Sequence, residues 1–423
     1  MEVRASFLNS EFSAYHHRGR PAEDEELIRV GPGTPCGEYL RRFWQPVILT
    51  SELGELPRRV RILGEDLVAF RDKSGAIGLL EAHCPHRGTS LEFGLIQDTG
   101  IRCCYHGWLF ACNGAILETP GEPADSTLKD CLFHGAYPVH EHNGLVFGYM
   151  GPPEERPPFP IFDTYDLPGY RMVARAPTLW ECNWLQVKEN SMDPAHLAFL
   201  HTLPGSEGFT DDLKELGEWD WMETPVGMVY IDTRRQADRV WVRVADFILP
   251  NIHQFPPNAD PMALRNSVNR PMATTWAVPL DDTHTMQIGY YRAPEGKEMR
   301  RGGGFGQDGK RSYEERQLVP GDYDAQVSIH DGISRHGLEH LASTDRGVIM
   351  MRNLIRRGIR TVRTGAALDH PSFHNGAPVP TYSHDQVVSG VAPAATPEDD
   401  KKLLREVTRN VVTQAVKSGL ASA

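Results

Sequence analysis

The chain has 423 residues, and at roughly 150 residues per domain this length predicts two or three domains. Hydrophobic residues make up 40% and charged residues 24%, which fits a folded protein, and 44 basic against 56 acidic residues give a net charge of −12. This acidity argues against nucleic-acid binding, which needs a basic excess. The sequence shows neither a run of roughly 18 apolar residues nor a signal peptide, so we expect a cytoplasmic protein without a membrane partner.

The first part of the chain is expected to form an arm and a small β domain. Residues 1–42 are polar and interrupted by glycine and proline, which predicts a loosely structured N-terminal arm. Residues 43–150 carry short apolar runs between turn residues, which predicts a small antiparallel β domain. Two hairpins are expected in it, at 67–80 and at 108–117, the latter with Asn-Gly at its turn.

A second domain is expected after the proline-rich stretch 151–160, which predicts a stiff linker. Alternating strands at 240–244, 274–279 and 286–291, with helical spacing at 189–201 and 336–360, predict an α+β domain over residues 151–363. The C-terminal extension, 364–423, is expected to end in a helix from Pro397 to near Gly419, because acidic residues gather in its first turn.

Two short motifs, C-P-H-R-G at 84–88 and C-C-Y-H-G-W at 103–108, are the sharpest signals in the sequence. Each loop offers one thiolate and one imidazole, from Cys84 and His86 and from Cys103 and His106. A structural zinc site uses the same donors, but the C-x-H step is short for a zinc finger. Two cysteines and two histidines suit a [2Fe-2S] cluster with the cysteines on one iron and the histidines on the other.

A second group of candidate metal ligands is the pattern D-x-x-H-x-x-x-x-H, formed by Asp193, His196 and His201. The first two lie three residues apart and therefore share a helix face. The five-residue step to His201 does not fit an α-helix of about 3.6 residues per turn, so we expect a π-type bulge or a helix end. Two imidazoles and one carboxylate with open coordination positions are typical of non-haem Fe(II) oxygenases.

With both motif sets, the sequence resembles the Rieske non-haem iron aromatic-ring oxygenases, most closely the oxygenase (alpha) component of the phthalate-dioxygenase-like branch, over about residues 43–360. The resemblance implies a Rieske [2Fe-2S] domain followed by a helix-grip-like α+β catalytic domain built on an antiparallel sheet. It also implies that the two cysteines and two histidines of the first motifs hold the cluster.

The resemblance implies that His196 and His201 bind a mononuclear Fe(II) and that a later aspartate is the third ligand. Asp322 keeps the family's offset to Gln326 and is preferred, with Asp324 as the alternative. Asp193 is implied to connect the iron-bound histidine with the Rieske His106 of a neighbouring subunit. Asn190, one helical turn away, is expected to support that path.

The seven cysteines are an odd number, which fits metal binding or packing better than a disulfide scaffold. Relatives usually have proline where this chain has Cys104, and Cys103 keeps the family spacing to His106. We therefore expect Cys104 to be a small packed residue. The remaining cysteines are expected to be buried apolar residues, namely Cys36, Cys112, Cys131 and Cys182.

The function implied by the resemblance is that of a multicomponent oxygenase in aromatic catabolism, which hydroxylates or dihydroxylates a carboxylated aromatic compound with O₂. Electrons would come from NADH or NADPH through a ferredoxin or flavin reductase, and the assembly would be a homotrimer or a dimer of trimers. An O-demethylase or aryl-ether-cleaving monooxygenase is the alternative. A Rieske electron carrier is the rival, which the second histidine pair disfavours. Arg243 is a candidate for facing the substrate, although an exposed arginine is the commoner outcome.

Overall fold

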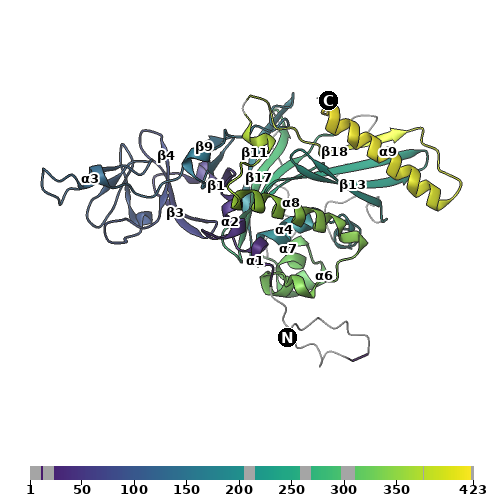
Figure 1. Cartoon of the computed structure of the whole chain (residues 1–423), viewed down its shortest axis with the longest axis horizontal. Helices are drawn as coiled ribbons and strands as arrows, with labels where there is room; N and C mark the ends of the chain where they lie inside the picture. The colour runs from purple at the N-terminus through teal and green to yellow at the C-terminus, as the bar shows by residue number, and fades with distance from the viewer. Residues whose placement is uncertain are drawn as a thin grey trace.

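The structure is a computed structural model, and it describes residues 11–12, 23–203, 215–257, 268–296, 310–374 and 376–420. The chain forms an elongated molecule with a small lobe, made by strands β1 to β10, and a large lobe, made by strands β11 to β18 (Figure 1). The helices α8 (Arg346–Arg363) and α9 (Pro397–Ser418) belong to the large lobe.

The small lobe consists of three small antiparallel sheets with the strand orders β1-β10-β9, β2-β3-β4 and β5-β6-β7-β8. Both predicted hairpins form, as β3–β4 and as β7–β8. In the second turn Gly114 has φ +85°, and an added Cβ would lie 2.1 Å from the His134 carbonyl oxygen, so glycine is required there. The strands are β1 Gln45–Leu49, β2 Arg58–Ile62, β3 Glu65–Arg71, β4 Ile77–Glu81, β5 Leu95–Ile96, β6 Ile101–Arg102, β7 Leu109–Phe110, β8 Ile116–Glu118, β9 Val139–His142 and β10 Leu145–Gly148.

The large lobe is built on an eight-stranded antiparallel sheet of order β11-β17-β16-β15-β14-β13-β12, with β18 paired to β14. The α+β class with an antiparallel catalytic sheet is therefore confirmed. The strands are β11 Tyr170–Trp180, β12 Glu218–Thr224, β13 Gly227–Gln236, β14 Arg239–Ile248, β15 Ile252–Phe255, β16 Ala273–Pro279, β17 Thr285–Pro294 and β18 His384–Ser389.

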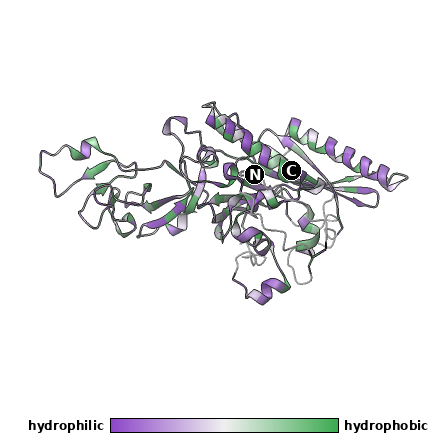
Figure 2. Ribbon diagram, turned by 60° about the horizontal axis from the view of Figure 1, so that its bottom comes forward, coloured by the Kyte–Doolittle hydropathy of each residue, from purple (hydrophilic) through white to green (hydrophobic). Residues whose placement is uncertain are grey.

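Helices cover this sheet and carry the candidate site. α8 packs on β12 and β13 and on the N-terminal helix α2 (Pro35–Leu40), whereas α9 covers β12 and β13. Figure 2 shows hydrophilic and hydrophobic residues mixed along α9, whose buried residues recur at helical spacing. The other α-helices are α1 Glu25–Ile28, α3 Leu128–Cys131, α4 Trp184–Asn190, α5 Ala195–Phe199, α6 Tyr313–Leu318 and α7 Asp322–Val327. Within the described residues, none of the helices combines the length and apolar composition of a membrane span.

Three expectations differ from the structure: the loose N-terminal arm, the separate C-terminal extension and the start of the helix over 336–360. Residues 23–42 are folded rather than loose, since Leu27 and Val30 are fully buried and α2 packs on α8. The C-terminal segment was expected to lie outside the catalytic domain, but its strand β18 pairs with β14 in the large sheet. The helix expected over 336–360 begins only at Arg346, after two short 3₁₀ turns. The helix that begins at Pro397 forms as predicted and has Gly419 at its C-cap.

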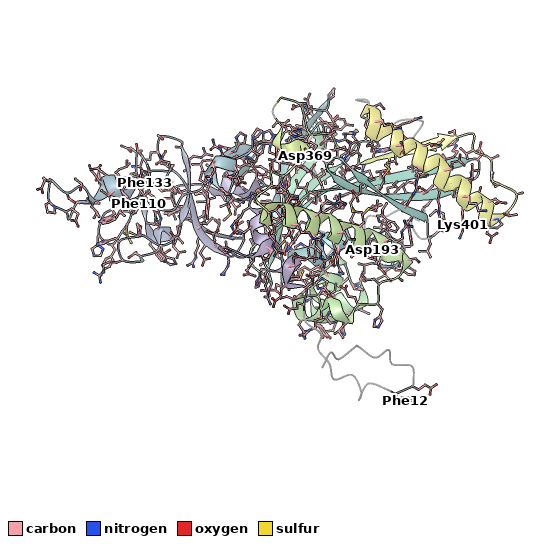
Figure 3. All side chains as sticks on the ribbon, in the orientation of Figure 1. Phe12, Phe110, Phe133, Asp193, Asp369 and Lys401 are labelled. Carbon is pink, nitrogen blue, oxygen red and sulfur yellow. The ribbon has the colours of Figure 1, made fainter. Side chains whose placement is uncertain are left out.

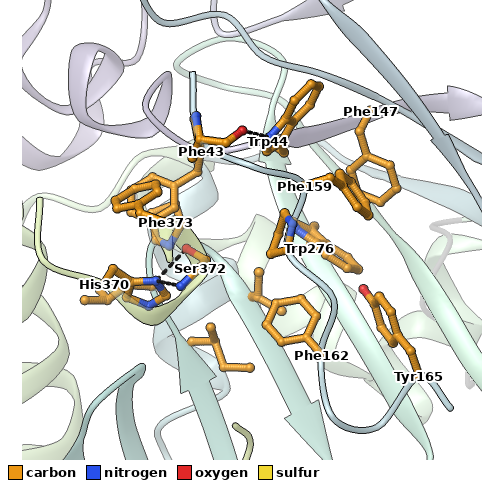
Figure 4. Close-up of a pocket in the computed structure, with 16 residues that line it drawn as sticks. Phe43, Trp44, Phe147, Phe159, Phe162, Tyr165, Trp276, His370, Ser372 and Phe373 are labelled. Carbon is orange, nitrogen blue, oxygen red and sulfur yellow. Dashed lines mark hydrogen bonds between the residues drawn. The ribbon is translucent and has the colours of Figure 1, made fainter. Parts of the chain in front are cut away.

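The two lobes meet at a cluster of aromatic side chains, drawn in Figure 4. The rings of Phe43 and Phe373 lie 4.9 Å apart, and Trp44 donates a hydrogen bond to the Pro157 carbonyl. The cluster encloses a cavity of about 20 Å³, which has room for about one water molecule. It therefore joins the lobes and is too small to hold an organic ligand.

Candidate active site

The two cysteine–histidine loops of the small lobe have the same backbone geometry. Gly88 and Gly107 both have φ +76°, and their N–H groups donate to the carbonyls of Cys84 and Cys103, at 2.9 and 3.1 Å. Each cysteine is 3% exposed, and both belong to the hydrophobic cluster that contains Phe110. The repeated turn presents one thiol and one imidazole from each loop.

The histidines of these loops lie together. Their ring centroids are 4.4 Å apart, and the His86 ring stacks on Trp108. His86 Nδ1 is buried and has no hydrogen-bond partner among the described residues. Burial raises the pKa of the Cys84 thiol to about 11, and burial together with His86 lowers the pKa of His106. A metal that stabilises a thiolate and accepts a neutral imidazole fits this donor set.

The spacing of the donors distinguishes the two metal-site alternatives. A single metal ion needs at least three donor atoms close together. In the described part of the chain, the group whose donor atoms all lie within 4.8 Å of one another consists of His196, His201 and Asp322. The four loop donors do not form such a group, so they are too far apart for one tetrahedral zinc ion. They fit a cluster that contains two irons.

The second site forms where a helix is interrupted. α4 ends at Asn190, Pro194 precedes α5, and a 3₁₀ turn at Leu200–Thr202 carries His201. The structure thus shows the predicted helix end rather than a π-type bulge. This change of helix type brings the His196 and His201 rings to a centroid distance of 5.3 Å, although five residues separate them.

Asp322, the first residue of α7, completes the group. Its Oδ1 lies 3.1 Å from His201 Nε2 and 3.7 Å from His196 Nε2, and it accepts a hydrogen bond from the Asn190 amide at 3.4 Å. The alternative, Asp324, is engaged elsewhere, because its carboxylate binds Arg311 and Arg316. The geometry therefore favours Asp322 as the carboxylate of this site.

Asp193 contacts His196 through its backbone. The Asp193 carbonyl oxygen accepts a hydrogen bond from His196 Nδ1, so Nδ1 carries the proton and Nε2 is available toward Asp322. The Asp193 carboxylate accepts from the Ala195 N–H at 2.9 Å, and its other oxygen is 3.9 Å from His196 Nδ1. The implied connection between Asp193 and His196 is therefore made by the backbone carbonyl, and the Asp193 carboxylate is 32% exposed.

A cavity of about 160 Å³ opens next to His196, His201 and Asp322. Apolar and aromatic side chains form much of its wall, among them Trp180, Val187, Leu197, Phe255, Met272 and Tyr291. Burial lowers the pKa of His253, which also lines the cavity, well below its ordinary value, so this ring is neutral. A largely apolar cavity with a few convergent polar groups is the usual form of a small-molecule site.

Arg243 lines this cavity, but its charge is already compensated. The side chain is 3% exposed, so Arg243 is not the solvent-exposed arginine that is the commoner outcome. It donates to the Asp385 carboxylate at 2.9 Å and to the carbonyls of Pro256 and Pro257. Arg243 therefore joins β14 to β18 and is a poor receptor for a substrate anion.

The cysteine predictions are only partly correct. Cys36 and Cys182 are buried as expected, and Cys112 is half-buried. Cys104 and Cys131 are exposed, so the expectation that they are packed residues is wrong. For Cys104 the reason is its place in the turn of the second motif loop, where the neighbouring Cys103 points inward and takes the buried position.

The comparisons with known proteins show the family of the chain. The family model of the Rieske [2Fe-2S] domain matches residues 43–137. The chain is 42% identical over 417 residues to the tert-butanol monooxygenase / tert-amyl alcohol desaturase oxygenase subunit of Aquincola tertiaricarbonis, covering 91% of this chain and 87% of the relative. It is 38% identical over 376 residues to phenoxybenzoate dioxygenase subunit alpha of Ectopseudomonas oleovorans, covering 84% and 88%. The chain therefore belongs to the Rieske oxygenase family, as an oxygenase (alpha) component that incorporates oxygen from O₂.

Solved structures show the same fold. NdmA of Pseudomonas putida CBB5, as a QL mutant with caffeine, is 19% identical with a TM-score of 0.62, covering 80% of this chain and 97% of that chain. Dicamba monooxygenase bound to dicamba is 20% identical with a TM-score of 0.59, covering 77% and 99%. Both likenesses concern the arrangement of the two lobes and not the substrate.

Proposed function

We propose that this oxygenase component uses two iron sites in its chain to hydroxylate or dihydroxylate an aromatic substrate that binds in the 160 Å³ cavity. The Rieske cluster would be held by the two cysteines and two histidines of the motif loops. Mononuclear Fe(II) would be held by His196, His201 and Asp322. The observation that carries the proposal is that these three side chains meet at the wall of that cavity.

When bound, the cluster supplies single electrons and the Fe(II) binds and activates O₂. The chain's own residues prepare the site. The Asp193 carbonyl holds the proton of His196 on Nδ1, and the Asn190 amide orients the Asp322 carboxylate. The apolar wall excludes water and holds a flat ring beside the metal ligands. Together these contacts fix two imidazoles and one carboxylate before substrate arrives.

The position of the two sites supports electron transfer between subunits. Phe110, which packs with the cluster cysteines, lies in the small lobe, whereas Asp193 lies in the large lobe (Figure 3). A neighbouring chain would bring its small lobe to the large lobe of this one, as in a homotrimer or a dimer of trimers. The partly exposed Asp193 carboxylate would then reach His106 of the partner subunit, with Asn190 supporting the path.

The relatives and the cavity size guide the substrate proposal. A cavity of about 150 Å³ holds a benzene ring, so this cavity accommodates a single ring with a small substituent. Phenoxybenzoate dioxygenase and phthalate 4,5-dioxygenase subunits are relatives named for aromatic carboxylates. A second candidate function is O-demethylation, because the oxygenase subunit of 5,5'-dehydrodivanillate O-demethylase is 32% identical over 87% of this chain.

Electrons would come from NADH or NADPH through a cytoplasmic ferredoxin or flavin reductase.

The test is turnover with ¹⁸O₂, NADH and a surrogate reductase on aromatic acids, aryl methyl ethers and tert-butanol. Two labelled atoms in the product of an aromatic acid indicate dihydroxylation, and one indicates monooxygenation. Release of ¹⁸O-labelled formaldehyde together with an unlabelled phenol indicates O-demethylation, because the new oxygen enters at the methyl carbon and the aryl–oxygen bond is kept. We expect about three irons per chain. Two irons per chain, with no label in any product, would contradict the proposal and indicate an electron carrier.

A further inference from the structure

Lys188 is a charged residue in an unusual position. It lies on α4, two residues before Asn190, and is 1% exposed. It lines the same 160 Å³ cavity as the candidate metal ligands. Neither the metal site nor the lobe interface uses its side chain.

The other buried cations of the described residues all have a carboxylate partner. They are Arg41 with Glu65, Arg234 with Asp232, Arg243 with Asp385, Arg270 with Asp163, and Arg352 with Glu189 and Glu339. The Lys188 ammonium has no ion pair and no side-chain hydrogen bond within the part of the chain that the structure describes. Burying an ammonium group without a counter-charge costs free energy, so the position of Lys188 in the cavity wall needs an explanation.

The groups around the cavity do not supply a counter-charge to Lys188. Asp322 is shared by His201 and Asn190, and Asp193 binds the Ala195 N–H. Apart from the phenols of Tyr230 and Tyr291, the remaining titratable side chains of the wall are basic: Arg175, His196, His201, Arg243 and His253. Burial alone lowers the pKa of Lys188, to about 7, with no carboxylate opposing it. An anion that enters the cavity would be the missing partner.

We propose that Lys188 is the anion-binding residue of the substrate cavity, where its ammonium pairs with the carboxylate of an aromatic acid and sets the ring beside the iron ligands. This inference rests on the proposed function and names the residue that would select an acid over a neutral ring. The low-dielectric wall strengthens such a pair relative to a surface ion pair. Arg243 cannot take this role, because Asp385 neutralises it.

The test compares two probes of equal shape, benzoate and benzamide, by calorimetry with the fully metallated protein under anaerobic conditions. The wild type is expected to bind benzoate about tenfold or more tightly than benzamide, since a hydrogen-bonded charge pair is lost with the amide. In Lys188→Met this preference is expected to fall to near parity, while benzamide affinity stays unchanged and shows that the cavity is intact. The variant is also expected to unfold at a higher urea concentration without ligand, because an unpaired buried charge has been removed.

The matched control is Arg175→Met, which removes a half-buried cation of the same cavity whose guanidinium lies over the Tyr291 ring. It is expected to keep the preference for benzoate. A wild type without that preference, a Lys188→Met variant that retains it, or its loss in Arg175→Met would each overturn the assignment. The binding measurement does not depend on turnover, so it is separate from the test of the proposed function. If the protein incorporates ¹⁸O into tert-butanol but does not bind benzoate, Lys188 is not an acid receptor, while the assignment as an oxygenase stands.

Discussion

Arg352 on α8 is predicted to hold the helix that leads to the metal site. Its guanidinium binds Glu189 at 2.6 Å and Glu339 at 2.7 Å, and its side chain is 8% exposed. Glu189 is on α4, directly before Asn190, whose amide binds Asp322. Replacing Arg352 with methionine keeps most of the side-chain volume but leaves two largely buried carboxylates without their cation.

The expected loss follows from this burial. Breaking a buried ion pair by removing one partner costs about 3–5 kcal/mol in the free energy of unfolding. Arg357→Met on the same helix is the control, since Arg357 and its partner Glu223 are 64% and 48% exposed. An exposed pair of this kind contributes about 0–1 kcal/mol. Urea unfolding followed by tryptophan fluorescence at neutral pH measures both variants.

The difference between wild type and Arg352→Met is expected to depend on pH. Burial opposes ionisation of Glu339, but hydrogen bonds from Arg352 and Ser334 outweigh it and hold its pKa below the ordinary value. A lowered carboxylate pKa stabilises the fold above the unfolded-state pKa of about 4.3, and this stability is lost as pH falls through the folded-state value. The gap between wild type and variant therefore narrows at acid pH. Equal losses in Arg352→Met and Arg357→Met at neutral pH would refute the reasoning.

Two pairs of substitutions test the candidate metal ligands. Cys103→Ser is expected to lose the visible absorption of the oxidised cluster, whereas Cys104→Ser keeps it because that thiol is exposed; the reverse outcome would move the ligand to Cys104. Asp322→Ala is expected to lose the mononuclear iron and all turnover with the cluster in place. Asp324→Ala is expected to keep iron and to lose stability, because the ion pairs of Asp324 with Arg311 and Arg316 are removed. Metal analysis that finds full iron in Asp322→Ala and depletion in Asp324→Ala would reassign the carboxylate.

The sequence predicted the parts of this protein that depend on neighbours in the chain. The Rieske motif loops are contiguous, so their donors could be recognised from spacing, and the β7–β8 hairpin follows from one Asn-Gly pair. The break between His196 and His201 was expected because five residues do not fit one helical turn. Local chemistry alone determines each of these features.

Features that depend on distant contacts could not be predicted in this way. Asp322 and Asp324 differ in their partners: Asp322 lies beside two histidines more than 120 positions earlier in the chain, whereas Asp324 binds Arg311 and Arg316. Arg243 is buried because β18, some 140 positions later, supplies Asp385, and no local pattern indicates that pairing. Lys188 was missed, although its position among the buried residues of α4, next to Val187, was a visible signal.

The most direct test of the account is the rate at which the reduced cluster is oxidised after mixing with substrate and O₂ in Asp193→Asn. The substitution keeps size and removes the charge of the partly exposed carboxylate, and Asp369→Asn, at a 97% exposed side chain of the same lobe, is the control. If electrons pass between subunits through Asp193, the variant keeps both metals and its oligomer but its cluster oxidises about 100-fold more slowly, while the control is unchanged. Oxidation of the Asp193→Asn cluster at the wild-type rate would contradict the proposed route between the two iron sites.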